Sequence, residues 1–174
     1  MSTPPQGVQI QDEVIPPLLP LSHATRAVLY NALFSYMKRI PAPAGLQWKT
    51  FSQAIKHWDA VPKENQPAMF LERQLETWTQ TKAYGVTKFE LHPTIWIYFR
   101  ADGLNTQNTY PDMYIDPLKD AIEQLFQTLP ALGGRLTLGG VCQHCFINGI
   151  IASDPGLQDA SGQAVVRVPI TIWI

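Results

Sequence analysis

The chain has 174 residues, of which 45% are hydrophobic and 16% are charged. This length and apolar content predict a single globular domain with a substantial core, and they exclude a wholly disordered chain. A net charge of −1 excludes the basic field that draws a protein to nucleic acid. Since soluble domains are usually about 25% charged, part of the surface is expected to face something other than water.

Membrane and secretion signals are not recognisable in the sequence. The apolar runs are far shorter than the roughly 20 residues that span a bilayer. The first residues lack the basic and apolar regions of a secretory signal, and two cysteines cannot form a disulfide framework. We therefore expect a soluble protein that is made in the cytosol and has no membrane partner.

Residues 1–21 are predicted to form an extended, proline-rich arm. Its prolines oppose helix formation and favour extended backbone; they are Pro4, Pro5, Pro16, Pro17 and Pro20. The arm is either a flexible tail or a segment that lies on a neighbouring subunit, and it is more apolar than a typical solvated linker. Residues 22–174 are expected to form the folded domain.

Two segments show helical periodicity. The first is predicted to run from Ser22, a good N-cap, to Arg39. The second is predicted to run from Asp116 to Leu129, with Asp116 as the N-cap and Pro117 at the first helical position. Each segment carries an apolar stripe at helical spacing, so each is expected to bury one face.

Three strand-like segments separate the two helices. Residues 50–60 are consistent with a strand, and residues 67–80 fit a strand or a helix on pattern alone. Residues 87–101 are the clearest strand, because aliphatic side chains fall on one parity and polar or aromatic ones on the other. Pro93 cannot donate to a ladder, so a bulge or a sheet edge is expected there.

Two further strands are predicted to close the chain. Residues 135–152 fit a long, bent strand with a bulge at Gly139 and Gly140, and residues 164–174 alternate as a last strand. Pro169 again indicates an edge or a bulge. The order helix, three strands, helix, two strands predicts an α+β domain, with two helices packed on a mixed, mostly antiparallel sheet of about five strands.

A Cys-x-x-Cys motif is the sharpest local signal. Such a motif can be a redox pair or half of a zinc site. On a strand, however, Cys142 and Cys145 point to opposite faces, and a zinc site needs four ligands. Cys142 and His144 share a face, which leaves a Cys–His nucleophile as an alternative. Ordinary buried cysteines are the simpler interpretation.

Other candidate sites carry little weight. The histidines at 57, 92 and 144 are scattered, and their spacing does not support a zinc site. The glycine pairs at 133–134 and 139–140 fit neither phosphate-binding pattern and open no helix. The sequence thus indicates no catalytic residue and no cofactor, which favours a protein that works by assembly. Closed rings cover strand edges with identical neighbours.

Aromatic side chains mark one candidate interface. Trp96 and Tyr98 lie on the polar parity of their strand, with Arg100 two residues further on. They must be covered by another part of the chain or by a partner, and aromatic residues are enriched at interfaces. We expect contacts between subunits on this face.

Six segments in order carry a family resemblance: FSQAIKHWDAV (51–61), QPAMFLERQLET (66–77), FELHPTIWIYFRAD (89–102), YIDPLKDAIEQLF (114–126), LTLGGVCQHCFINGIIASDPG (136–156) and AVVRVPITIWI (164–174). With the order of elements, they resemble the tail-terminator and tail-completion (minor tail) proteins of long-tailed bacteriophages. The resemblance covers residues 22–174. Its most specific part is the stretch from Leu-Gly-Gly-Val through His-Cys to an acidic-Pro-Gly turn.

The resemblance implies a structural virion protein, assembled in the host cytoplasm, that forms a ring of about six subunits at the head–tail junction. There the ring would end polymerisation of the tail-tube protein and join the tail to a neck or connector protein. The resemblance brings no catalytic residue, cofactor, metal or nucleic-acid recognition. The alternatives are a neck or head-completion ring protein, a small thiol enzyme that uses Cys142 or Cys145 with His144, and a monomeric binding module.

Two long loops are the expected sites of contact with the tail tube or the neck. They span residues 81–86 and 102–113, and loops of this length often carry binding residues. The side chains that we expect to contribute are Lys82, Tyr84 and Tyr110.

Overall fold

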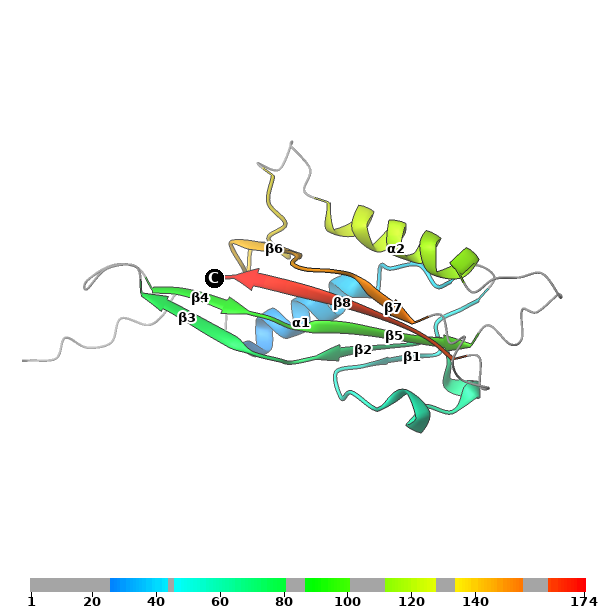
Figure 1. The fold of residues 1–174 in the computed structure, drawn as a ribbon. Coiled ribbons are helices and arrows are strands. Elements are labelled where there is room, and N and C mark those ends of the chain that lie inside the picture. The colour runs from blue at the N-terminus through cyan, green and yellow to red at the C-terminus, as the bar shows by residue number, and fades with distance from the viewer. Residues whose placement is uncertain (1–25, 44–45, 81–86, 101–111, 128–133, 155–162) are drawn as a thin grey trace, which may run out of the picture.

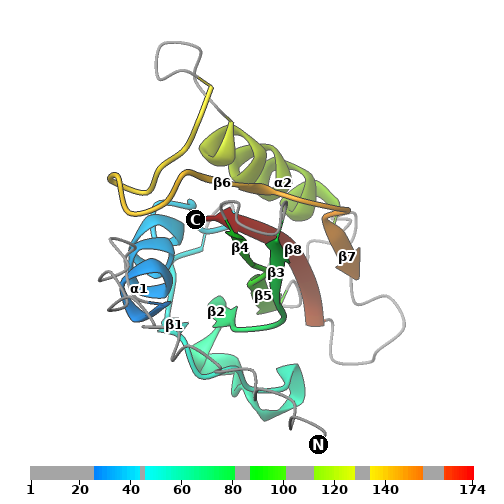
Figure 2. The ribbon, with the colours of Figure 1, turned by 90° about the vertical axis from the view of Figure 1, so that its left-hand side faces the viewer.

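The computed structural model describes residues 26–43, 46–80, 87–100, 112–127, 134–154 and 163–174. In this part of the chain, two helices lie over the same face of one mixed sheet (Figure 1, Figure 2). The predicted single α+β domain is therefore confirmed. The predicted arm, residues 1–21, and the domain boundary at residue 22 lie outside the described residues.

Helix α1 (Arg26–Met37) is the first predicted helix. Its buried side chains recur three or four residues apart and so share one face; they are Leu29, Tyr30, Leu33 and Met37. After the helix, Arg39 and Ile40 close two turn hydrogen bonds, and the Trp48 indole donates to the Ile40 carbonyl at 2.8 Å. Residues 22–25, where the predicted N-cap falls, are outside the described residues.

The sheet contains eight strand segments. Their bounds are β1 (Thr50–Ser52), β2 (Ala68–Glu72), β3 (Glu76–Gln80), β4 (Thr87–Leu91), β5 (Thr94–Arg100), β6 (His144–Ile147), β7 (Ala152–Asp154) and β8 (Gln163–Trp173). β2 and β3, β4 and β5, and β6 and β7 are halves of three kinked strands, so joining each pair leaves five. Across the sheet these lie in the order β1, β2–β3, β4–β5, β8 and β6–β7. Only β1 pairs in parallel, with β2, among the described pairings. The predicted order and approximate number of strands are confirmed.

The kink between β2 and β3 lies opposite Pro93. Residues 73–75 of the first strand oppose residues 92–93 of the second, so the first strand carries one extra residue, which defines a β-bulge. Residues 67–80 are thus a bulged strand, not a helix. The pairing of β4 and β5 with β8 keeps one register on both sides of Pro93, as expected for a single strand over residues 87–101.

β8 runs through the middle of the sheet, with β4 and β5 on one side and β6 and β7 on the other. The expectation of an edge at Pro169 is therefore wrong. The Pro169 carbonyl accepts the Asn148 N–H at 3.1 Å, and the Pro93 carbonyl accepts the Ile170 N–H at 2.9 Å. Each proline keeps its acceptor in the ladder, so its missing N–H costs one bond and does not end the sheet.

The prediction for residues 135–152 is wrong in two respects. Strand pairing begins only at His144, and the bulge falls at residues 148–151, where four residues oppose two of β8. Gly139 and Gly140 instead have φ of +83° and +90° and lie in a tight turn. This left-handed backbone is open to glycine but incompatible with a strand.

The predicted strand at residues 50–60 is wrong beyond its first three residues. The Ser52 hydroxyl accepts the Ala54 N–H at 3.0 Å, a local bond that turns the chain out of the sheet. Two short 3₁₀ turns follow, Trp58–Ala60 and Lys63–Asn65.

Helix α2 (Asp112–Phe126) begins four residues before the predicted N-cap Asp116. Pro117 consequently lies inside the helix, where it removes one hydrogen bond. The added turn buries Ile115 completely, and this apolar burial opposes the cost of the proline. The predicted end at Leu129 lies outside the described residues.

The main core fills the space between the helices and the inner face of the sheet. The aliphatic parity predicted for residues 87–101 is confirmed by the buried side chains Phe89, Leu91, Ile95, Ile97 and Phe99. β8 contributes the alternate residues Ala164, Val166, Val168, Ile170 and Ile172. A smaller cluster lies on the outer face and consists of Val61, Ala68, Phe70 and Tyr98.

The buried face of α1 is expected to carry much of the stability of the domain. Leu33→Ala should lower the free energy of unfolding by about 2–5 kcal/mol, because a fully buried side chain leaves a cavity. Urea unfolding followed by circular dichroism measures the change. The matched control is Val28→Ala on the same helix, where the side chain is 43% exposed and a change under about 0.5 kcal/mol is expected. Equal losses in both variants would contradict the packing described.

Candidate interaction surfaces

Tyr98 lies in the interior of the folded chain. Its side chain is only 3% exposed and packs in the outer cluster against Phe70, with the ring centroids 5.4 Å apart. Burial raises the pKa of the Tyr98 hydroxyl to about 12, because the charged phenolate would lose its hydration. The covering residues include Val61 and Trp58, which follow β1 in the sequence. This ring is therefore covered by the chain itself.

Trp96 remains partly accessible on the same outer face. Its indole N–H donates to the Glu72 carboxylate at 2.7 Å, and the Arg167 guanidinium lies 5.6 Å from the ring centroid. A carboxylate, an aromatic ring and an exposed cation thus form one amphipathic strip across β2, β5 and β8. Arg100 lies at the end of β5 and is half-buried.

Three predicted contact residues lie outside the described residues: Lys82, Tyr84 and Tyr110. Two others, Trp96 and Arg100, share the outer face of β5 with Tyr98. The structure therefore brings together only the strand part of the predicted interface.

Cys142 and Cys145 are free cysteines, and both are buried. Cys145 on β6 is fully buried, while Cys142 lies in the preceding turn, with its Sγ 3.8 Å from the Leu136 carbonyl oxygen. Burial raises the pKa of the Cys142 thiol to about 11 and that of Cys145 well above its ordinary value. A nucleophilic cysteine needs the opposite shift.

His144 is also placed for packing. Its Nδ1 accepts the Leu136 N–H at 3.2 Å, and its ring stacks on Phe146 with centroids 4.8 Å apart. Burial lowers the pKa of His144, so the neutral ring that accepts this bond is favoured. The described hydrogen bond thus engages the Nδ1 atom of His144 with the backbone.

The three histidines considered for a zinc site are each engaged separately. The Nδ1 atom of His57 lies 2.6 Å from the Asp59 carboxylate, and the Nδ1 atom of His92 lies 3.2 Å from the Thr171 hydroxyl. No group of three or more His, Cys, Asp or Glu side chains that could hold a metal ion occurs in the described part of the chain.

The outer edge of β3 is an exposed surface that the sequence analysis did not single out. Leu75 is 76% and Trp78 is 58% exposed, and among the described strands β3 pairs only with β4. Trp78 packs against Phe89 at 4.3 Å between centroids, with the ring planes tilted by 36°, while more than half of its side chain stays exposed. The signal in the sequence that could have identified this edge is Leu75 followed by a short strand in which Trp78 stands between Thr77 and Thr79.

The opposite edge of the sheet is formed by β6 and β7, each of which pairs only with β8 among the described strands. Beside it, a groove of about 760 Å³ lies between α2 and the bulge at residues 148–151. Ile150 in this bulge is 86% exposed. In the described part of the chain, each of the two edges thus has a strand partner on one side only and carries exposed apolar side chains, but the two differ in sequence and shape.

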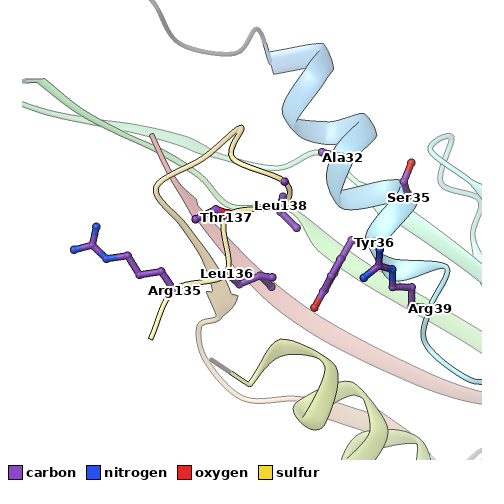
Figure 3. Close-up of a pocket in the computed structure, with 9 residues that line it drawn as sticks. Ala32, Ser35, Tyr36, Arg39, Arg135, Leu136, Thr137 and Leu138 are labelled. Carbon is purple, nitrogen blue, oxygen red and sulfur yellow. The ribbon is translucent and has the colours of Figure 1, made fainter. Parts of the chain in front are cut away.

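A second groove, of about 640 Å³, lies between α1 and the segment 135–139 (Figure 3). α1 and the turn after it supply Ala32, Ser35, Tyr36 and Arg39 to its lining. Arg135 and Arg39 lie on opposite sides of the groove, and Leu136 and Leu138 project toward Tyr36 (Figure 3).

Comparisons with known proteins do not assign this chain to a family. No family model matches it, and no match is found among curated proteins. None of the helices described here is long and apolar enough to span a membrane.

The state of the cysteines can be measured by alkylation with iodoacetamide at pH 8. Because folding raises the thiol pKa, the thiolate forms only at higher pH, and the Cys142 thiolate should be about a hundredfold scarcer than at an ordinary pKa of 9.0. Folded protein should therefore label at least that much more slowly than the same chain in denaturant. Rapid labelling of the folded chain near pH 7 would restore the thiol-enzyme alternative.

Proposed function

We propose that this chain is a structural subunit of a ring at the head-proximal end of the tail of a long-tailed bacteriophage. In this role it ends polymerisation of the tail tube and joins the tail to the neck, without catalysing a reaction. The proposal rests on the family resemblance and is supported by the confirmed order of helices and strands. The observation that carries it is the pair of unlike, open edges of the sheet.

Unlike edges favour a ring over a symmetric pair. A contact between the β3 edge of one copy and the β6–β7 edge of the next is heterologous, because it joins different surfaces. Heterologous contacts repeat, and they close into a ring when the rotation between neighbours allows it. Open strands can add to one another through backbone hydrogen bonds, with Trp78 and Ile150 as exposed apolar anchors.

The thiol enzyme is the less favoured alternative. It requires an accessible thiolate beside a general base, whereas both thiols are buried with raised pKa values and His144 bonds the backbone.

Light-scattering mass measured across a concentration series, with negative-stain images of the heaviest fraction, tests the ring. A closed particle of about six subunits, near 117 kDa for a 19.5 kDa chain, is expected at high concentration. The terminating activity is tested by adding the chain to polymerising tail-tube protein. Tubes should become shorter, with a ring at one end. Tube lengths that are the same with and without the chain would contradict the proposed function.

The β3 edge can be tested separately. Leu75→Lys combined with Trp78→Lys should leave the chain folded but monomeric, because two exposed apolar side chains are replaced by charges on an edge strand. The mass of the particle in solution is the measurement. Met113→Lys is the control, since it also charges an exposed apolar position but lies on α2 and on no strand. A ring that forms equally well in the double variant and in the control would exclude the β3 edge from the contact.

A further inference from the structure

The side chain of Trp78 lies at the β3 edge, on the side of the sheet that the helices cover. Trp78 has the same parity as Glu76, whose carboxylate accepts a hydrogen bond from Arg26 on α1 at 2.8 Å. The Arg26 guanidinium lies 5.9 Å from the centroid of the Trp78 ring, and this ring also packs against Phe89 of the main core. Because 58% of the Trp78 side chain stays exposed, this edge presents a large aromatic group to its surroundings.

A groove at the opposite edge of the sheet has the size and lining for such a group. It measures about 760 Å³ and lies between α2 and the bulge at residues 148–151. α2 packs on the same face of the sheet as α1 (Figure 2). Pockets with a mainly apolar lining and a few charged groups suit aromatic anchors. Apolar and charged side chains both line this groove; they include Phe126, Ile147, Ile150, Lys119 and Glu123.

The two open edges lie at the same level of the sheet. Glu76 on β3 is opposite Leu91 on β4, which in turn is opposite Ile172 on β8. Ile172 is also opposite Cys145 on β6. One row of residues therefore runs from the β3 edge to the β6 edge. A rotation about an axis along the strands brings β3 of one copy beside β6 of the next without a shift along the strands.

The strand directions are also compatible. β3 pairs with β4, β4 with β8 and β8 with β6, each time antiparallel, so β3 and β6 run in opposite directions. In a ring the same rotation relates each copy to the next, so the strand directions and the helix-covered face repeat. β3 of one copy thus meets β6 of the next as an antiparallel pair. Trp78 then lies on the same side of the joined sheet as α2 of the next copy.

Charges beside Trp78 are complementary to charges in the groove. The β3 edge carries the ion pair of Arg26 and Glu76, while α2 lines the groove with Lys119 and Glu123, one helical turn apart. Two such pairs attract each other when Glu76 faces Lys119 and Arg26 faces Glu123. Complementary charges fix the register of a contact and disfavour other arrangements.

We propose that the groove beside α2 receives Trp78 from a second copy of this chain. In this contact β3 pairs with β6 of the second copy, Glu76 faces Lys119, and Arg26 faces Glu123. The inference rests on the proposed ring, for which it specifies the contact between neighbouring subunits.

Mixing two variants tests the contact. The edge variant, Leu75→Lys with Trp78→Lys, keeps an intact groove, and the groove variant, Glu123→Lys with Ile150→Lys, keeps an intact edge. Each should be monomeric alone, as measured by light scattering, with the far-UV circular dichroism of the unmodified chain. Their equimolar mixture should form a particle of two chains, near 39 kDa for a 19.5 kDa chain, because one complete contact remains.

The control variant is Glu64→Lys with Met113→Lys, which changes one exposed acidic and one exposed apolar residue outside the groove lining and the β3 edge. It should assemble as the unmodified chain does. A ring formed by the unmodified chain and equally by the groove variant would overturn the contact but leave the proposed ring standing. A mixture of folded variants that stays monomeric would also overturn the contact. An unmodified chain that is monomeric at every concentration would contradict both proposals.

Charge reversal tests the expected ion pair between copies. Glu76→Lys and Lys119→Glu should each weaken association about tenfold, because each places like charges opposite one another. The two substitutions combined in one chain should restore association, since every contact then again joins opposite charges. Light scattering over a concentration series measures the change. A combined variant that associates no better than the single variants would overturn the assigned facing of Glu76 and Lys119.

Discussion

The organisation of the sheet depends on β8 and on two prolines, Pro169 within β8 and Pro93 between β4 and β5. Pro169 and Pro93 each use a carbonyl but no N–H in the ladder, one toward Asn148 and the other from the neighbouring strand toward Ile170. β8 keeps a single register with β4 and β5 on both sides of these prolines. The two flanking strands, β2–β3 and β6–β7, each carry a bulge next to them. The bulges at residues 73–75 and 148–151 therefore lie near the same level of the sheet, on opposite sides of β8. They divide two strands, β2–β3 and β6–β7, into halves that differ in direction.

Much of this arrangement follows from local pattern, because alternation along a strand is a short-range property. The parity of residues 87–101 correctly separates core side chains from outer ones, whereas the bulge expected at Pro93 lies in the neighbouring strand, at residues 73–75. What the pattern cannot provide is the neighbour on each side. Pro169 suggests an edge by local rules, yet two strands flank it, and α2 begins early because burying Ile115 outweighs the proline that follows it.

The candidate surfaces show the same division between local and distant effects. Trp96 and Tyr98 are equivalent by alternation, but residues after β1 fold over Tyr98 and leave Trp96 partly open. The raised pKa of Cys142 likewise depends on its burial in the main core, which its motif cannot indicate. Conversely, the ring of Trp78 is exposed on a strand that has no second neighbour among the described strands. The position of a strand within the sheet cannot be read from its own residues.

The ion pair between Arg26 and Glu76 joins the first turn of α1 to this open edge, at 2.8 Å and beside the rings of Trp78 and Phe89. In the isolated chain the Arg26 side chain is 52% exposed, so water screens the pair and it contributes little to stability. A neighbouring strand laid over β3 would exclude that water and lower the local dielectric constant. The free energy of the Arg26–Glu76 ion pair thus depends on how much water surrounds it, even when the distance between the two groups stays the same. The start of the helix is consequently sensitive to whatever covers the edge.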